Sequence, residues 1–176
     1  MKTSFNMLLL LALLALPALG QSQLTCATNN GALTITGYDG PGGAVSIPAA
    51  INGLPVTRIG DKAFGSCTNL TAVTIPSSIT GIGQRAFYFC TSLTNVTIGT
   101  SVASIGEGAF CYCWSLPSIT IPVGVISIGG AALYDCTSLT NVTIPASVTS
   151  IGDHAFGFCT RLTSVKIPNC VTNIVW

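Results

Sequence analysis

Apolar and polar positions repeat along this chain with a period of 23 residues. The register begins at Ile59 and runs through five repeats to Asn173. Each repeat opens with Ile-Gly, continues with Ala-Phe (Ala-Leu once), and places a Cys three residues later. A Leu and a segment of the Val-Thr-Ile-Pro type follow. Because internal repeats of about 20–50 residues are typical of solenoids, we interpret residues 59–173 as five stacked coils.

The second half of each repeat predicts a strand. Val73 and Ile75 alternate around Thr74, which indicates a strand with one buried face. Pro76 should end this strand, because proline has no N–H to donate to a neighbouring strand. Stacked coils would pair such strands in parallel, so that equivalent side chains form columns.

The first half of each repeat has a different spacing. Ala63, Phe64 and Cys67 stand three and four residues apart, which predicts one short helical turn. At the bend before it we expect Gly60 to adopt a positive φ. The sequence thus predicts an α/β solenoid whose parallel strands alternate with short helical turns. In the first coil the residues expected in the core are Ile59, Ala63, Phe64, Cys67, Leu70, Val73, Ile75 and Ile79.

Residues 1–20 have the pattern of a secretory signal peptide. Lys2 supplies a positive start, an apolar run extends from Met7 to Leu19, and small residues precede Gln21. The run is shorter than the roughly 20 apolar residues that a membrane-spanning helix needs. We therefore expect cleavage before Gln21, no membrane span afterwards, and a protein that is secreted, extracellular or held at the cell surface.

The segments flanking the repeats depart from the register. Residues 21–58 contain strand-like and turn-like stretches, and we interpret them as a β-rich N-terminal cap. Residues 174–176 begin an incomplete sixth repeat. We expect either that the chain belongs to a longer array or that this uncapped turn pairs with something else, for example by end-to-end self-association.

The motif Ile-Gly-x-x-Ala-Phe-x-x-Cys-x-x-Leu-x-x-Val-x-Ile-Pro resembles that of the BspA-like leucine-rich repeat family. The resemblance covers Ile59 to Asn173 fully and Val45 to Gly60 partly. It implies a right-handed leucine-rich-repeat solenoid in an extracellular setting, since known members are largely surface or secreted proteins of bacteria and protists. It also implies adhesion or the binding of host proteins and other cells. It carries over no functional residue, because the motif consists of core positions.

Charge excludes one class of partner. Only 6% of the residues are charged, and loss of Lys2 with the leader would leave five basic residues against five acidic ones. Without a basic surplus, the chain lacks the main source of affinity for a phosphate backbone. We therefore expect no nucleic-acid partner.

Five of the eight cysteines share one repeat position and should form an inward column. Their Cα atoms would lie ~4.8 Å apart in adjacent coils, within disulfide range. Their parallel Cβ directions disfavour that bond, however, and five residues cannot pair off completely. We expect small buried side chains with unreactive thiols. Cys111 should lie near the surface, and pairing of Cys26, Cys111 or Cys170 stays open. The column members are Cys67, Cys90, Cys113, Cys136 and Cys159.

Candidate chemistry is sparse. The sole histidine, His154, shares a column with Lys62, Arg85, Gly108 and Ala131, a mixture typical of a solvated position. Three carboxylates share another column in alternate coils, ~10 Å apart, which is close to the spacing in inverting glycosidases. We expect the ridge to offer no cleft that would raise a pKa, and so predict no enzyme, no metal site and no cofactor. These carboxylates are Asp61, Glu107 and Asp153.

Two surfaces are candidates for binding. One is a flat, nearly uncharged row of outward hydroxyls and amides on the strands, and the other is a set of aromatic residues after each Ala-Phe pair. Each surface allows two interpretations, ligand recognition or ordinary covering of the solenoid. The strand residues are Thr74, Asn95, Thr97, Thr120, Asn141 and Thr143, and the aromatic residues are Tyr88, Phe89, Tyr112, Trp114, Tyr134 and Phe158.

We therefore expect a non-catalytic binding or adhesion module. Its partner would be a protein or a polysaccharide at a cell surface. Two alternatives stay open. In the first alternative, the chain is a structural segment of a surface array without a specific ligand. In the second, its threonine rows bind ice or another crystal surface.

Overall fold

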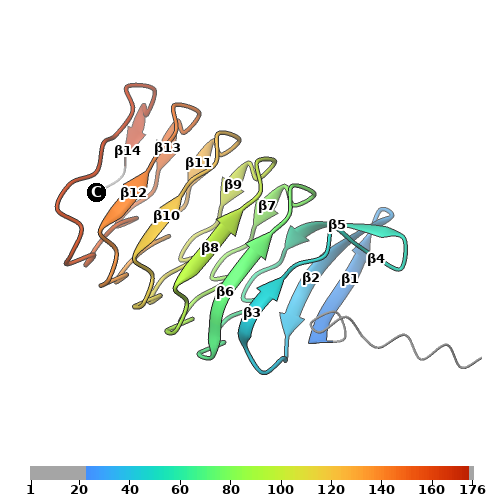
Figure 1. Ribbon diagram of the computed structural model, residues 1–176. Helices are drawn as coiled ribbons and strands as arrows, with labels where there is room; N and C mark the ends of the chain where they lie inside the picture. The colour runs from blue at the N-terminus through green and yellow to red at the C-terminus, as the bar shows by residue number, and fades with distance from the viewer. Residues whose placement is uncertain (1–22, 175–176) are drawn as a thin grey trace, which may run out of the picture.

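Five coils of 23 residues lie one beside the next in the computed structural model, which describes residues 23–174 (Figure 1). The expected signal peptide and the end of the expected sixth repeat, Val175 and Trp176, lie outside the described residues. Coils 1–4 each contribute a longer strand to one row, and every coil ends in a two-residue strand of another row. In the last coil the equivalent residues 164–167 form no strand, so the strand expected there from the sequence is absent. We number the coils 1 to 5, for residues 59–81, 82–104, 105–127, 128–150 and 151–173.

The short strands belong to a nine-stranded sheet that runs the length of the molecule. Its order is β1-β2-β5-β7-β9-β11-β13-β14, with β4 paired to β5 beside this path. From β2 onwards neighbours along the path are parallel, and Ile59, Ile82, Ile105, Ile128 and Ile151 stand in register. The strands are β1 (Leu24–Asn29), β2 (Ala32–Tyr38), β4 (Ala50–Ile51), β5 (Leu54–Ile59), β7 (Gly81–Ile82), β9 (Ser104–Ile105), β11 (Ser127–Ile128), β13 (Ser150–Ile151) and β14 (Asn173–Ile174).

The longer strands form a second row, which we call the front row. β3, β6 and β8 make one parallel sheet, and β10 and β12 make another. Pro117 lies where these two sheets are separated. The equivalent residue of the preceding coil, Thr94, donates its N–H to Thr71 O over 2.8 Å. Proline has no N–H, so coil 3 cannot make this bond to coil 2. The strands are β3 (Gly43–Ser46), β6 (Leu70–Ile75), β8 (Asn95–Ile98), β10 (Ser118–Thr120) and β12 (Asn141–Thr143).

The interior consists of columns of like side chains. Phe64, Phe87 and Phe110 are fully buried and stack with ring centroids 5.0 and 5.2 Å apart. Tyr38 continues the stack from the N-terminal side, 5.2 Å from Phe64, and so covers the first ring. In coil 1, seven of the eight residues expected in the core are buried, and Cys67 is half-buried. The 23-residue period therefore identifies the inward positions because each coil repeats the same path.

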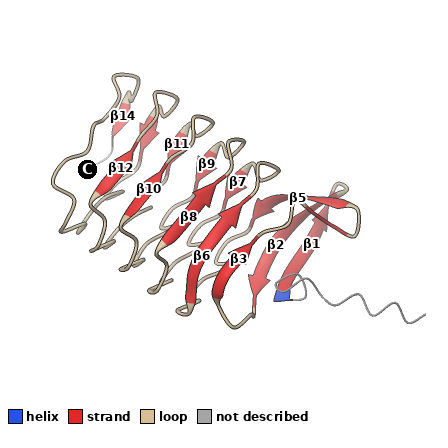
Figure 2. Cartoon of the chain, viewed as in Figure 1, coloured by secondary structure: helices blue, strands red, loops and turns tan. Residues whose placement is uncertain are grey.

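The segment that carries the Ala-Phe pair is not helical, so the expectation of short helical turns is wrong. We call this segment the ridge (residues 60–68, 83–91, 106–114, 129–137 and 152–160). The ridge is drawn as loop in every coil (Figure 2), and residues 23–174 contain no α-helix. Its N–H groups alternate between two directions. Lys62 and Phe64 donate to Gln84 O and Ala86 O of the next coil, at 2.9 and 2.7 Å.

Alternate ridge residues donate within their own coil. Ala63 donates to Gly60 O and Cys67 donates to Phe64 O, at 3.3 and 3.2 Å. An α-helix would need successive bonds four residues back and negative φ throughout. Here Lys62 and Ser66 have φ of 57° and 61°, and equivalent residues in coils 2–5 are also left-handed. Two tight turns thus present inward residues at the spacing that a helix would give.

The position after the opening Ile is glycine in every coil, for a reason other than a positive φ. Gly60 does not have the left-handed φ expected from the sequence, because the left-handed residues lie two and six positions later. Instead, the coils approach most closely here. A Cβ built on Gly106 would lie 2.6 Å from the carbonyl carbon of Gly83. The glycine column therefore permits the close stacking of the coils.

Residues 23–58 form two hairpins beside coil 1. β1 and β2 are antiparallel and are joined by Asn30-Gly31, whose φ values are 49° and 76°. β4 and β5 are joined in the same way by Asn52-Gly53, with φ of 50° and 77°. Two positive φ values are what a tight two-residue hairpin turn requires, and Asn-Gly supplies them at low cost.

Candidate functional site

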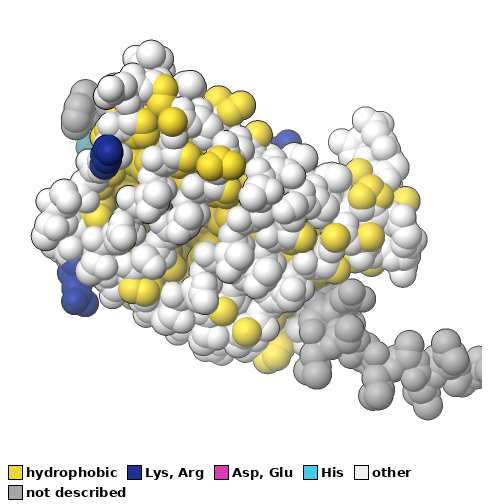
Figure 3. All heavy atoms as spheres, turned by 45° about the horizontal axis from the view of Figure 1, so that its top comes forward, with side chains coloured by type: hydrophobic (Ala, Val, Ile, Leu, Met, Phe, Trp, Pro, Cys, Tyr) yellow, Lys and Arg dark blue, Asp and Glu magenta, His cyan; other side chains and the backbone are white. Residues whose placement is uncertain are grey.

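The six outward strand residues lie side by side on neighbouring strands of the front row. All six are exposed, and Thr74 pairs with Thr97 just as Thr120 pairs with Thr143. The strand hydroxyls therefore repeat at the spacing of neighbouring strands, ~4.8 Å. A shallow hollow of about 500 Å³ lies beside Thr97, Thr120 and Val123, and no ionisable group lines it. On the face viewed in Figure 3, charged side chains are few.

The six predicted aromatic residues form one continuous cluster along the ridge, which we call the aromatic cluster. Tyr112 is central: its ring centroid lies 5.5 Å from Tyr88 and 5.9 Å from Tyr134, and both pairs are edge-to-face. Phe89 contacts Trp114 at 5.1 Å, and Tyr134 contacts Phe158 at the same distance. The structure therefore joins residues from four coils into a single surface.

The ends of the aromatic cluster remain open to solvent. Trp114 is 40% exposed and Phe158 is 67% exposed. The Trp114 Nε1–H donates to Asp135 Oδ2 over 3.0 Å, which fixes the orientation of the indole. In coil 2, the Arg85 guanidinium lies 5.8 Å from the centre of the Tyr88 ring, within cation–π range.

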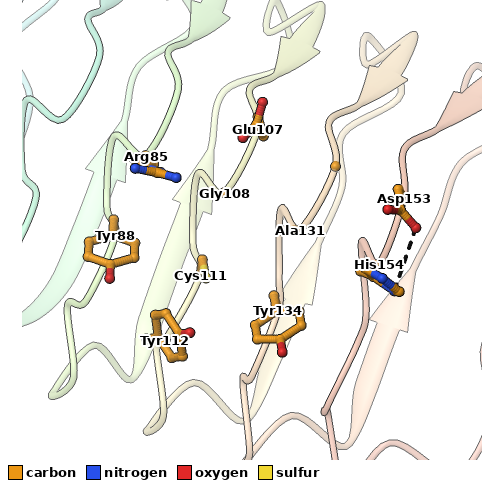
Figure 4. Close-up of a pocket in the computed structure, with 11 residues that line it drawn as sticks. Arg85, Tyr88, Glu107, Gly108, Cys111, Tyr112, Ala131, Tyr134, Asp153 and His154 are labelled. Carbon is orange, nitrogen blue, oxygen red and sulfur yellow. Dashed lines mark ion pairs between the residues drawn. The ribbon is translucent and has the colours of Figure 1, made fainter. Parts of the chain in front are cut away.

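A groove of about 500 Å³ runs beside this cluster, on the ridge of coils 2–5. Small residues create it. In one column Gly108 and Ala131 stand between Arg85 and His154, and in the next column Gly130 also lacks a side chain. Figure 4 shows Arg85 at one end, the Asp153–His154 pair at the other, and Tyr88, Tyr112 and Tyr134 along one side. The ridge therefore carries a groove that the sequence does not predict.

Charged groups of both signs line the groove. Arg85 supplies a cation, and Glu107 and Asp153 supply carboxylates. His154 Nδ1 lies 3.6 Å from Asp153 Oδ1 and is largely exposed. Asp153 Oδ1 is buried and has no hydrogen-bond partner, because this distance to His154 is too long for a hydrogen bond. Asp61 lies outside the groove lining, so only two of the three predicted carboxylates come together here.

The groove floor contains a thiol that will not ionise near neutral pH. Cys111 lies between Tyr88 and Tyr134 in its column and is buried, contrary to the expectation that it lies near the surface. Burial, and then the nearby Asp135 carboxylate, raise the pKa of Cys111 to about 11, and Arg85 acts in the opposite direction. Loss of surrounding water, and then the neighbouring Cys111 and Tyr134, raise the pKa of the Tyr112 hydroxyl, which therefore remains a proton donor.

The cysteine column lies behind the ridge. Cys90, Cys113, Cys136 and Cys159 are buried, and all eight cysteines of the chain are free thiols. The Cys90 thiol donates to Phe64 O over 3.1 Å, and the next three make the same bond to the coil before them. The column thus supplies weak donors between coils as well as packing, a role that the sequence does not reveal.

We expect the column thiols to resist alkylation in the folded protein. Burial is the main cause that raises the pKa of Cys90 to about 12 from 9.0, and it raises that of Cys113 as well. The thiolate is the reactive form, so at pH 8 the reactive fraction of Cys90 should fall about a thousandfold on folding. Mass spectrometry after timed labelling with iodoacetamide, without reductant, would measure this. Labelling of the denatured chain is the control, and fewer than eight reactive thiols there would contradict the prediction.

The groove was not predicted, although its residues were noted singly. The sequence indicates a solvated column for His154 and a second column for the three carboxylates, without relating the two to a common groove. The usable signal was the coincidence of small residues, Gly108, Gly130 and Ala131, in adjacent coils and columns. Within residues 23–174, no group of three or more His, Cys, Asp or Glu side chains is placed to hold a metal ion.

Comparisons with known proteins place these features in context. The profile of the BspA type Leucine rich repeat region matches residues 57–175 in six copies. The crystal structure of a T. pallidum leucine-rich repeat protein superposes with a TM-score of 0.82 at 33% identity, covering 88% of this chain and 79% of that one. No curated protein matches closely enough to count as a relative.

Two further solved structures are similar over most of this chain. A leucine-rich cell surface protein of Faecalibacterium prausnitzii is 36% identical, with a TM-score of 0.63 over 87% of this chain and 49% of that one. The pneumococcal vaccine antigen PcpA, 21% identical with a TM-score of 0.68 over 88% and 45% of the two chains, shares the fold. This chain thus spans about half the length of both proteins. In the part of the chain that the structure describes, no helix is long and apolar enough to cross a membrane.

Proposed function

The chain belongs to the BspA-type leucine-rich repeat family, and we propose that it is a non-catalytic binding module that acts outside the cell, at a cell surface. The observation that carries this proposal is the aromatic cluster. Its apolar rings form a continuous and partly exposed surface with polar groups at its edges, as at many recognition surfaces. An extracellular site agrees with the leader pattern of residues 1–20 and with the similar surface protein of F. prausnitzii.

The fold itself does not demand these aromatic residues. The position of Trp114 is threonine in the other four coils, and the position of Tyr88 and Tyr134 is glycine in coils 1 and 5. All five coils make the same ridge hydrogen bonds within the coil, and coils 1–4 make the same bonds to the next coil, whichever residue stands there. Large aromatic side chains at positions that the repeat can leave small therefore favour recognition over packing.

Trp114→Thr provides a direct test, because it installs the residue that four coils already use. We expect the fluorescently labelled protein to bind saturably to at least one member of a panel of bacterial and animal cells. Loss of an exposed aromatic anchor should weaken that binding about tenfold or more. Flow cytometry across a concentration series would measure the effect.

Thr97→Ala is the matched control, since Thr97 is exposed on the front row and lies away from the aromatic cluster. Binding should be unchanged in this variant. Loss of binding in Thr97→Ala alone would move the recognition surface to the strand hydroxyls. Absence of saturable binding to every cell type would instead favour a structural segment of a surface array.

A further inference from the structure

We infer that the groove beside the aromatic cluster binds a short stretch of a neutral polysaccharide. This inference rests on the proposed function, whose binding surface it narrows to one groove and one class of ligand. The volume of the groove, about 500 Å³, falls within the range of ordinary small-molecule sites. From Arg85 in coil 2 to His154 in coil 5 it extends over three coil spacings, or ~14 Å. This length suits a few linked sugar rings.

Three backbone N–H groups in the middle of the groove are already paired between coils. Gly108 N–H donates to Gly130 O, and Ala131 N–H donates to Asp153 O, at 2.8 and 2.7 Å. Tyr112 N–H is likewise used by Tyr134 O at 2.9 Å. A peptide that binds by strand addition needs unpaired N–H and C=O groups. A ligand in the middle of the groove must therefore be recognised mainly through side chains.

Those side chains offer ring faces together with both kinds of hydrogen-bonding group. Arg85 is a donor, Glu107 is an acceptor, and the tyrosine hydroxyls can do either. Asp153 Oδ1 has no hydrogen-bond donor in the structure, and a ligand hydroxyl can supply one. Sugars combine apolar ring faces with hydroxyls that both donate and accept, which matches this set.

The charges of the groove indicate a neutral sugar. One guanidinium stands against two carboxylates. A polyanionic glycan would meet more repulsion than attraction there. The tyrosine rings, by contrast, contribute to binding without regard to ligand charge. Figure 4 shows these rings on the same side of the groove as Cys111.

A groove-filling variant tests this inference. Ala131→Gln places a neutral side chain in the middle of the groove, and Lys62→Gln makes the matched change in coil 1, outside it. Both backbones are already left-handed, with φ of 52° and 57°, so the two substitutions should cost similar backbone strain. Tyr134→Ala is a second groove variant, at a position where two coils have only glycine.

The probes are neutral hexasaccharides of β-1,4-linked glucose, β-1,4-linked N-acetylglucosamine and α-1,4-linked glucose, titrated into the full chain by calorimetry. We expect saturable binding of at least one, weakened about tenfold by Ala131→Gln and by Tyr134→Ala. Lys62→Gln should bind within about twofold of the unchanged protein. A heparin hexasaccharide should bind at least about tenfold more weakly than the best neutral probe.

Three outcomes would overturn the inference: no binding of any neutral hexasaccharide, binding by both groove variants that equals that of the unchanged protein, or preference for the heparin probe. The cell assay separates these from failure of the proposed function. Cell binding that is lost in Trp114→Thr while all neutral hexasaccharides fail would retain a binding module and reject its saccharide ligand. Absence of binding in both assays would reject both.

Discussion

Phe87→Ala should lower the free energy of unfolding by about 3–5 kcal/mol. Phe87 is fully buried and stacks between Phe64 and Phe110, with centroid distances of 5.0 and 5.2 Å. Truncation would remove both ring contacts and leave a cavity in the middle of a continuous column. The coils above and below are fixed by hydrogen bonds on three sides, so they cannot collapse into that cavity. Urea denaturation followed by circular dichroism would measure the change.

Two controls identify the cause. Phe87→Leu installs the residue that coil 4 uses at the same position, Leu133, and should cost about 1 kcal/mol. Phe158→Ala removes a ring that is 67% exposed, and should change the unfolding free energy by no more than about 0.5 kcal/mol. A loss below about 1 kcal/mol for Phe87→Ala would show that the stacked column is not the core of this solenoid.

Gly106→Ala should have the second largest effect, a loss of about 3 kcal/mol. The added Cβ would lie 2.6 Å from the carbonyl carbon and 2.7 Å from the oxygen of Gly83 in the preceding coil. Both neighbours are backbone, so relief requires the two coils to separate. That movement would stretch the bond of 2.9 Å from Gly106 N–H to Ile82 O. Overpacking of this kind typically costs about 1–3 kcal/mol, and the rigid neighbour places this site at the upper end.

Gly37→Ala is the matched control for the glycine prediction. A Cβ on Gly37 would meet only the Thr25 side chain, at 3.5 Å, and the backbone there is not left-handed. Its substitution should change stability by less than about 0.5 kcal/mol. Thermal and urea unfolding of both variants would measure the difference. Similar losses in the two would refute the close approach of coils at Gly106.

The sequence predicted the inward and outward positions because a repeat of fixed length gives every coil the same path. The period alone placed Phe64, Phe87 and Phe110 in one column, and the structure confirms their stacking. The end of the strand before Pro76 was also predicted correctly. Alternation in a strand follows directly from backbone geometry, so it can be identified without knowledge of the neighbours.

The ridge could not be predicted from spacing. Inward residues three and four positions apart are equally consistent with a helical turn and with two left-handed turns in succession. The choice depends on the next coil, whose carbonyl groups accept the N–H groups of Lys62 and Phe64. The same dependence on a neighbouring coil explains the glycine that follows the opening Ile of each coil. Its close contact involves residues 23 positions away, which no local pattern describes.

By itself, the sequence determined that this protein contains a solenoid of the BspA-type leucine-rich repeat family, since periodicity and core motif are local and repeated properties. Only the tertiary structure decided that its ridge is non-helical and that it contains a groove. The groove arises where small residues of coils 3 and 4 lie beside larger ones of coils 2 and 5. A cavity is a property of the space between coils, and that space exists only after they stack.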